Sequence, residues 1–374
     1  MKEFFKRNAA VIVSAILLLI LIAMPTGYED AVIYEGRERC RAEVLEVYND
    51  NITTIGIVST GDQTCLVELQ NGAYAGTVMT AYNMLSGSVE TDKIFAVGDE
   101  AYVLVSHNGE EVTMISMVDH YRLDVETVLI VLFFAFLILV AGKTGVRAIL
   151  SFVITILMIW KVLIPNCLNG INPIVIGFVI TAVLTVVIIS LVFGYDKMAL
   201  SAISGSLIGT FVTMVMALMF TDLFHMNGSI LDGSAALLYN GYPNLDLKSL
   251  FIASIFIGSS GAVMDLAVDI TSAVNEVVDK KPDITALEAI KSGMNVGRAA
   301  MGTMTTTLLL AYSGGYLSLL MVFMAQGTPI DNLLNYKYVS SEILDTVVGS
   351  FGLVSVAPIT AICAGVLLTK KPPQ

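Results

Sequence analysis

Seven apolar runs of near-membrane length dominate the second two thirds of the chain and restrict its possible folds. They are 125–141, 146–164, 173–193, 199–220, 250–268, 301–324 and 346–368. A helix needs about 20 apolar residues to cross roughly 30 Å of hydrocarbon. Charged residues make up 14% of the chain, against about 25% in a typical soluble domain. A water-soluble fold could not bury so much apolar surface, so we expect a lipid bilayer to surround most of the chain.

A shorter apolar run, 9–24, follows three basic residues at the N-terminus and ends at Pro25. Such a run is typical of a cleaved signal peptide or of a retained anchor. No small-x-small cleavage motif follows Leu21. We therefore expect a retained membrane anchor that comprises residues 1–27. With this anchor we expect a mostly α-helical polytopic membrane protein of about eight transmembrane helices.

Residues 28–123 differ in kind from the rest of the chain. Short alternating runs rich in β-branched residues are separated by turn dipeptides such as Asn71-Gly72 and Asn108-Gly109. This pattern predicts a small antiparallel β domain, a barrel of the OB or SH3-like kind, between the first and second membrane helices. A long loop is expected over 86–96. Cys40 and Cys65 share this domain and are either a disulfide or two buried thiols.

The charge of the chain is concentrated in that β domain. The formal net charge is −12, and residues 28–126 alone hold 18 acidic against 5 basic side chains. An acidic domain is a poor partner for nucleic acid. The few cysteines and histidines are scattered, so we expect no metal centre and no cofactor. No nucleophile–base pair or glycine-rich phosphate loop is present, and we expect no enzyme, with a membrane enzyme as a remote alternative.

Lysine and arginine predict the orientation of the helices, because cytoplasmic loops carry the excess of positive charge. With the N-terminus in the cytoplasm, twelve basic residues fall on that side and three, Lys161, Lys248 and Lys337, fall on the other. The twelve are Lys2, Lys6, Arg7, Lys143, Arg147, Lys197, Lys280, Lys281, Lys291, Arg298, Lys370 and Lys371. We therefore expect both termini in the cytoplasm and the β domain on the other side of the membrane.

Charged residues at the membrane boundary gather between Gly258 and Tyr316. Asp265 and Asp269 are one helical turn apart and share a face, and Arg298 precedes the next apolar run. Intramembrane carboxylates often bind a proton or cation on a transport path. The alternative is that one aspartate pairs with Arg298 at the interface. We expect the two helices to be neighbours, with an aspartate within reach of Arg298.

Hydroxyl and glycine residues complete the candidate site. Thr303, Thr306 and Thr307 are candidate ligands opposite Asp265, although threonines in membrane helices also bond back to their own backbone. The glycines expected at close helix contacts or kinks are Gly205, Gly209, Gly261, Gly297, Gly302, Gly314 and Gly315. A capping box from Thr285 to Glu288 predicts an amphipathic cytoplasmic helix near 283–294. Residues 228–240 are either an ordinary loop or a short re-entrant helix.

Three segments of this region resemble the YibE/F-like family of bacterial multi-pass membrane proteins. They read GAVMDLAVDI (261–270), SGMNVGRAAMGTM (292–304) and TLLLAYSGG (307–315). The resemblance adds weight to Asp265, because GAVMD is among the most recognisable parts of the family pattern. In that pattern an asparagine is expected where this chain has Thr306, so we expect no side-chain amide at that position. The resemblance implies a seven-helix membrane domain over 124–374 and no particular activity.

Two functions follow from these observations. The first is a permease or secondary transporter for a small solute or ion, with Asp265 as the ionisable centre. The second is a scaffold without transport, whose outer β domain binds an envelope protein while the helices anchor it. A water-reachable polar cavity would favour the first function, and a solidly packed bundle would favour the second.

Overall fold

The chain forms two compact units, which are described separately. One unit is Glu29–Leu139, and the other joins the N-terminal helix to everything from Val140 onward. The structure is a computed structural model that describes residues 2–30, 33–109 and 111–369. The expected boundary at residue 124 differs from this division, because the helix that follows it belongs by its contacts to the first unit.

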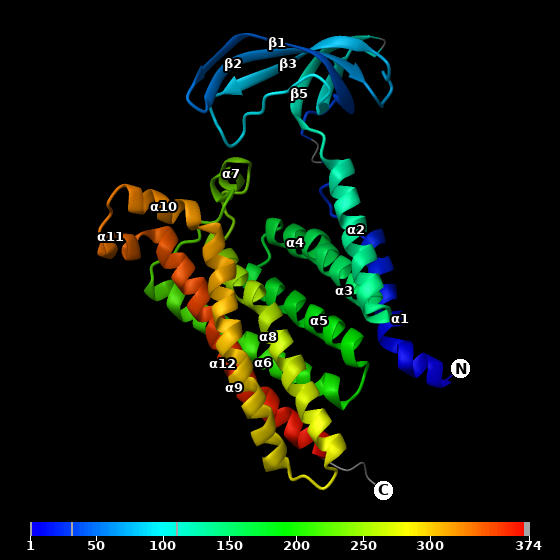
Figure 1. The fold of residues 1–374 in the computed structure, drawn as a ribbon, viewed down its shortest axis with the longest axis vertical. Helices are drawn as coiled ribbons and strands as arrows, with labels where there is room; N and C mark the ends of the chain where they lie inside the picture. Colours follow the sequence, from blue (N-terminus) through cyan, green and yellow to red (C-terminus); the bar gives the residue numbers. More distant parts are fainter. Residues whose placement is uncertain (1, 31–32, 110, 370–374) are drawn as a thin grey trace. The chain divides into compact units, whose positions relative to one another are not determined.

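The first unit contains a closed five-stranded barrel (Figure 1). Its strands are β1 (Glu38–Ile55), β2 (Val58–Leu69), β3 (Val78–Ser86), β4 (Glu100–His107) and β5 (Val112–His120). The order β1-β2-β3-β5-β4 closes with β1 paired to β4, which is the arrangement of an OB barrel. The prediction of an antiparallel domain is correct except for one pair, since β3 and β5 run parallel.

A buried amide clamp holds the long loop against the barrel. Gln63 is fully buried; its Nε2 donates to the carbonyl oxygen of Phe95 at 2.8 Å, and its Oε1 accepts from the Phe95 amide at 2.9 Å. Asn83 donates to the same Oε1 and to the carbonyl oxygen of Lys93. Loop backbone therefore satisfies the Gln63 amide and, with Gln63, the Asn83 amide nitrogen, which fixes the loop and places Phe95 in the core.

The two cysteines of the barrel are free thiols. Cys40 and Cys65 both lie in the apolar core, together with Val67, Val103 and Ile115. Burial raises the pKa of each thiol to about 11, because the apolar core disfavours the thiolate. The question left open by the sequence is therefore answered in favour of two buried thiols.

Arg41 connects the barrel to helix α2 (Leu123–Ala141). Its guanidinium pairs with Glu100 on β4 and with Asp124 in the first turn of α2, the latter at 2.7 Å. It also lies 5.0 Å from the centroid of the Tyr121 ring. Beyond its acidic first turn helix α2 is apolar, and none of its residues is buried, as expected for a helix whose surface meets lipid.

The second unit is a helical bundle (Figure 1). Its helices are α1 (Lys2–Ala23), α3 (Lys143–Met158), α4 (Ile164–Leu168), α5 (Pro173–Phe193), α6 (Lys197–Leu223), α7 (Ser234–Tyr239), α8 (Leu247–Lys280), α9 (Ala286–Gly315), α10 (Leu317–Ala325), α11 (Ile330–Asn335) and α12 (Lys337–Thr369), with a π-turn, Ile159–Leu163, joining α3 to α4. The short α7 lies within the segment for which the sequence left a loop or a helix open. Helix α12 packs against α6, α8 and α9 at the centre of the bundle.

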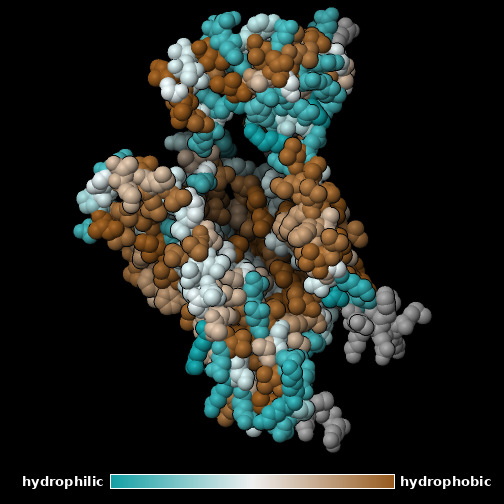
Figure 2. All heavy atoms as spheres, viewed as in Figure 1, coloured by the Kyte–Doolittle hydropathy of each residue, from teal (hydrophilic) through white to brown (hydrophobic). Residues whose placement is uncertain are grey.

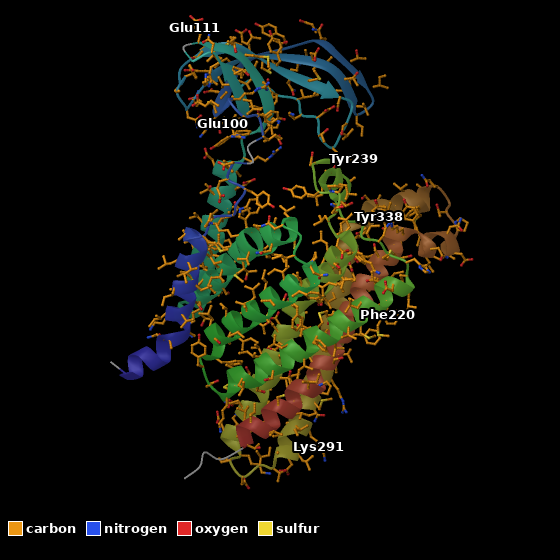
Figure 3. All side chains as sticks on the ribbon, turned by 180° about the vertical axis from the view of Figure 1, so that it is seen from behind. Glu100, Glu111, Phe220, Tyr239, Lys291 and Tyr338 are labelled. Atoms are coloured by element: carbon orange, nitrogen blue, oxygen red, sulfur yellow. The ribbon has the colours of Figure 1, made fainter. Side chains whose placement is uncertain are left out.

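Helices α8 and α9 form an antiparallel hairpin that is longer than a membrane is thick. Helix α8 has 34 residues, about 50 Å at 1.5 Å per residue. Figure 2 shows hydrophilic residues at the end where the two helices connect, beyond the apolar part of the bundle. Lys291 lies near this end and Tyr338 near the opposite end of the bundle (Figure 3).

The amphipathic segment 283–294, expected from the sequence, is not a separate helix. It forms the first turns of α9, which continues without a break to Gly315. The predicted capping box is present: the Thr285 hydroxyl accepts from the Glu288 amide at 3.3 Å, and the Glu288 carboxylate accepts from the Thr285 amide at 3.0 Å. The apolar face of this segment packs into the bundle core through Ile284, Ile290 and Met294.

Six helices of the described chain are long and apolar enough to cross a membrane. A seventh span is made by α9 and α10 if the two are counted together, although they are bent by 66°. The eighth expected span corresponds to α1, whose apolar part, Asn8–Ala23, is shorter than the others. Each of the eight expected spans thus corresponds to a helix or a bent helix pair. Six of the eight are single spans that are long and apolar enough to cross a membrane.

Candidate functional site

Two carboxylates lie inside the bundle on α12. Glu342 and Asp345 stand five and eight residues beyond the start of α12 at Lys337, which is roughly 8 and 12 Å along the helix. Glu342 Oε1 and Asp345 Oδ1 are buried and have no hydrogen-bond partner among the residues that the structure describes. Unpaired carboxylate oxygens inside a membrane protein are energetically unfavourable and mark functional positions.

A buried hydroxyl accompanies the two acids. Thr346 is 9% exposed, and its Oγ1 also has no hydrogen-bond partner within the described chain. Residues three and four apart lie on one face of a helix, so Glu342, Asp345 and Thr346 share a face of α12. Gly349, one turn further along this face, lies against α8, where a Cβ built on it would be 3.1 Å from Cβ of Ser259.

Tyrosines from the end of α9 close the site. The Tyr312 hydroxyl approaches Gly258 of α8, next to the Ser259 that lies against Gly349 on the acid-bearing face of α12, and Tyr316 follows directly after α9. A Cβ built on Gly258 of α8 would lie 2.8 Å from the Tyr312 hydroxyl, so a larger residue at 258 would force that hydroxyl to shift. The acids, Thr346 and these two tyrosines define the acid–tyrosine site, contributed by α12 and α9 and bordered by α8.

The acid–tyrosine site lies at a break in the bundle. Helix α9 ends at Gly315, α10 begins at Leu317, and the two helices are bent by 66°. Tyr316 is the residue between them. Discontinuous helices in transporters place ion and substrate sites at the break, because free backbone groups and polar side chains meet there.

This arrangement suits a proton or a small cation. Two carboxylates, two phenols and a hydroxyl supply oxygen atoms, which are ligands for hard cations. Among the described residues no group of three or more His, Cys, Asp and Glu side chains is placed to hold a metal ion. Two acids that lie in a region of low dielectric favour uptake of a proton, because the charged forms are poorly solvated and repel one another.

The aspartates predicted from the sequence lie elsewhere, on an exposed face of α8. Asp265 and Asp269 share this face with Gly258 and Gly261. Neither aspartate makes an ion pair with a described residue. Since Ser259 lies beside Gly349 of the parallel helix α12, Asp265 is roughly 15 Å further along the bundle than Asp345.

The expected pair between an aspartate and Arg298 is not formed. Helices α8 and α9 are neighbours as predicted, and a Cβ built on Gly297 would lie 3.1 Å from Cδ1 of Ile270. Arg298 is nevertheless exposed, and no carboxylate of the described chain is within ion-pair distance of it. The reason is rotation about the helix axis: Gly297 faces the core, and the next side chain points away from it.

The threonines have the expected depth but other partners. Gly297 lies against Ile270 and Tyr312 against Gly258, so the antiparallel register puts Asp265 at the level of 302–305. The hydroxyls of Thr303, Thr306 and Thr307 donate to backbone carbonyl oxygens of their own helix, those of Ala300, Gly302 and Thr303, at 2.9, 3.3 and 3.0 Å. No hydrogen bond joins them to Asp265, and the structure does not bring them together with it.

The predicted glycines fall into two groups. A Cβ on Gly205, Gly209 or Gly297 would meet a neighbouring helix at 3.1 Å or less. A Cβ on Gly261, Gly302, Gly314 or Gly315 would meet nothing within 4 Å. The first group lies at close helix contacts, while Gly314 and Gly315 coincide with the bend between α9 and α10.

Sequence reasoning missed Glu342 and Asp345 because the last apolar run was taken to begin at 346. The signal was nonetheless present: two acids three residues apart, in SSEILDTVV, directly precede that run. Beginning the predicted helix at Lys337, nine residues earlier, would have placed both acids inside the bundle.

Comparison with known families matches residues 129–370 to the description YibE/F-like protein. The match begins within α2 and ends at the C-terminal end of α12, so it covers the bundle apart from α1 and leaves out the barrel. No curated protein and no solved structure matches the chain.

Proposed function

The chain belongs to the YibE/F-like family, and on that premise we propose that it is a permease that moves a proton or a small cation across the cell membrane. One observation carries the proposal: Glu342 and Asp345 each bury a carboxylate oxygen without a partner, beside a broken span. A charge at the centre of a membrane helix costs about 2.5–3.5 kcal/mol on insertion scales. Binding of a proton or cation would remove that cost.

Asp265 and Asp269 supply a second step of the proposed path. They lie further along the bundle than Asp345 and are exposed to the outside of the packed helices. A cation that leaves the acid–tyrosine site toward the α8–α9 connection meets these carboxylates next. Gly261 leaves room for water on this face of α8, because a Cβ built on it would meet nothing within 4 Å.

The proposed orientation follows the distribution of lysine and arginine. Both termini and the α8–α9 connection are cytoplasmic, and the barrel and the acid–tyrosine site are toward the outside. Lys370 and Lys371, which contribute to the count, lie outside the described residues. A reporter inserted within 86–96 should be active only outside the cytoplasm, and a cytoplasmic signal from it would overturn this orientation.

Ion and solute contents of cells with and without the protein test the transport proposal. We expect at least one cation, or the internal pH, to differ between the two, and the difference to vanish in Glu342→Gln and in Asp265→Asn made separately. Asp279→Asn is the control, because Asp279 is exposed near the end of α8 and accepts a hydrogen bond from the Asn275 side chain. If Glu342→Gln and Asp265→Asn both behave like the wild type and the control, the carboxylates of Glu342 and Asp265 are structural.

A scaffold role remains the second candidate, and one observation favours it. The β1–β2 turn carries Ile55 and Ile57, which are 78% and 83% exposed, on a domain that is otherwise acidic. An exposed apolar tip on a rigid barrel suits protein binding. A photoreactive residue at position 57 should crosslink an envelope protein, and the same residue at exposed Glu90 should not; equal crosslinking at both positions would remove the argument.

A further inference from the structure

A polar pocket lies where α1, α3 and α5 meet, away from the acid–tyrosine site. Its volume is about 250 Å³, and its lining includes Val11, Arg147, Ser190 and Phe193. We infer that this pocket binds the phosphate group of an anionic phospholipid. The inference is independent of the transport proposal, because it uses none of the same residues.

Arg147 supplies the positive charge of the pocket. Its Nη1 donates to the carbonyl oxygen of Leu191 at 3.3 Å, and none of the described carboxylates forms an ion pair with it. A guanidinium has five N–H donors in a planar fork that matches phosphate. Most of these donors are therefore available to an anion in the pocket.

Ser190 supplies an independent sign of a ligand. It is 2% exposed and lines the same pocket, and its Oγ has no hydrogen-bond partner in the part of the chain that is described. A buried hydroxyl without a partner is unfavourable. A phosphate oxygen placed between Ser190 and Arg147 would accept from both.

The rest of the lining explains why the anion should belong to a lipid. Val11 and Phe193 give the pocket apolar walls. Val11 belongs to the short apolar part of α1, and Phe193 belongs to α5, which is long and apolar enough to cross a membrane. Acyl chains fit such walls, and free phosphate does not benefit from them. Basic pockets between transmembrane helices at the cytoplasmic side are known to hold anionic headgroups, which is the side proposed for this end of α3 and α5.

Lipid retention by the full-length protein tests the inference. The protein is placed in nanodiscs of phosphatidylcholine with or without phosphatidylglycerol, and bound lipid and thermal midpoint are measured. We expect phosphatidylglycerol to be retained preferentially and to raise the midpoint. Arg147→Gln and Ser190→Ala should weaken retention, the former by about tenfold, as expected for loss of a charged hydrogen bond. Arg147→Lys should recover part of it.

Two controls keep the test decisive. Lys143→Gln removes a charge from the same helix end but outside the pocket, and it should leave retention unchanged. Inorganic phosphate added to phosphatidylcholine discs distinguishes a free anion from a lipid. The inference is wrong if the wild type shows no preference for phosphatidylglycerol, or if Lys143→Gln lowers lipid retention as much as Arg147→Gln does. It is also wrong if inorganic phosphate raises the thermal midpoint as much as phosphatidylglycerol does.

Discussion

Gly205 of α6 lies directly against Thr360 of α12. A Cβ built on Gly205 would be 2.9 Å from Cβ of Thr360 and 3.1 Å from its Cα. The first distance is shorter than real Cβ contacts and the second, to a backbone atom, is tighter than most, so a methyl group would force the two helices apart. The contact between α6 and α12, at the centre of the bundle, thus depends on a hydrogen at this position.

Gly205→Ala should therefore destabilise the bundle. Overpacking of a well-packed contact costs about 1–3 kcal/mol, and we expect a lower thermal midpoint for the purified protein. Gly302→Ala is the matched control, because a Cβ there would meet nothing within 4 Å and the residue is also helical. A loss of stability in Gly302→Ala equal to that in Gly205→Ala would contradict this account of the contact.

Thr285→Ala should loosen the start of α9. The variant removes the hydroxyl that accepts from the Glu288 amide, and loss of an N-cap typically costs about 1 kcal/mol. Hydrogen exchange of the amides over 285–289 should become faster. Thr306→Ala serves as the control, since the Thr306 hydroxyl bonds only to its own helix backbone, and unchanged exchange over 285–289 in Thr285→Ala would contradict the cap.

The barrel thiols should resist alkylation and make stability depend on alkaline pH. Burial raises the pKa of Cys40 and of Cys65 to about 11 in the folded barrel, against an ordinary value of 9.0. The folded barrel therefore keeps its thiol protons more tightly than the unfolded chain. This contribution to stability is complete below pH 9.0 and is lost as the pH rises toward 11.

Mass spectrometry after treatment with iodoacetamide measures the first effect. We expect Cys40 and Cys65 to be unmodified at about pH 8 in the folded protein and modified after denaturation, because only the exposed thiolate reacts. Cys40→Ser and Cys65→Ser should each reduce the loss of stability between pH 9.0 and 11. Rapid alkylation of both thiols in the native protein would contradict their burial.

Much of the architecture could be predicted because apolar length and strand alternation are local signals. The helices, the barrel and the neighbouring position of α8 and α9 follow from them. The parallel pairing of β3 with β5 could not, because it depends on closure of the barrel. The length of α9 was also missed, since its amphipathic start and its apolar part are different in composition but continuous in structure.

The candidate site was predicted less well, and the reason is rotation about helix axes. Sequence spacing gave the depth of Thr303 relative to Asp265, and the register agrees with it. Which face of α9 meets α8 depends on tertiary packing of Gly293 and Gly297, which no single segment reveals. Glu342 and Asp345 were missed for a different reason, because helix α12 begins well before its apolar run.

Proton or cation flux into liposomes that contain the purified protein tests the central claim most directly. The wild type and Asp345→Asn are compared with an internal pH dye and with an imposed gradient of pH or of a monovalent cation, with Asp279→Asn as the control. We predict flux in the wild type and the control, and at least a tenfold lower rate in Asp345→Asn, since its amide cannot exchange a proton. Equal flux in Asp345→Asn and wild type, or no flux above empty liposomes with any of the gradients, would contradict the claim that the buried acids of α12 form a transport site.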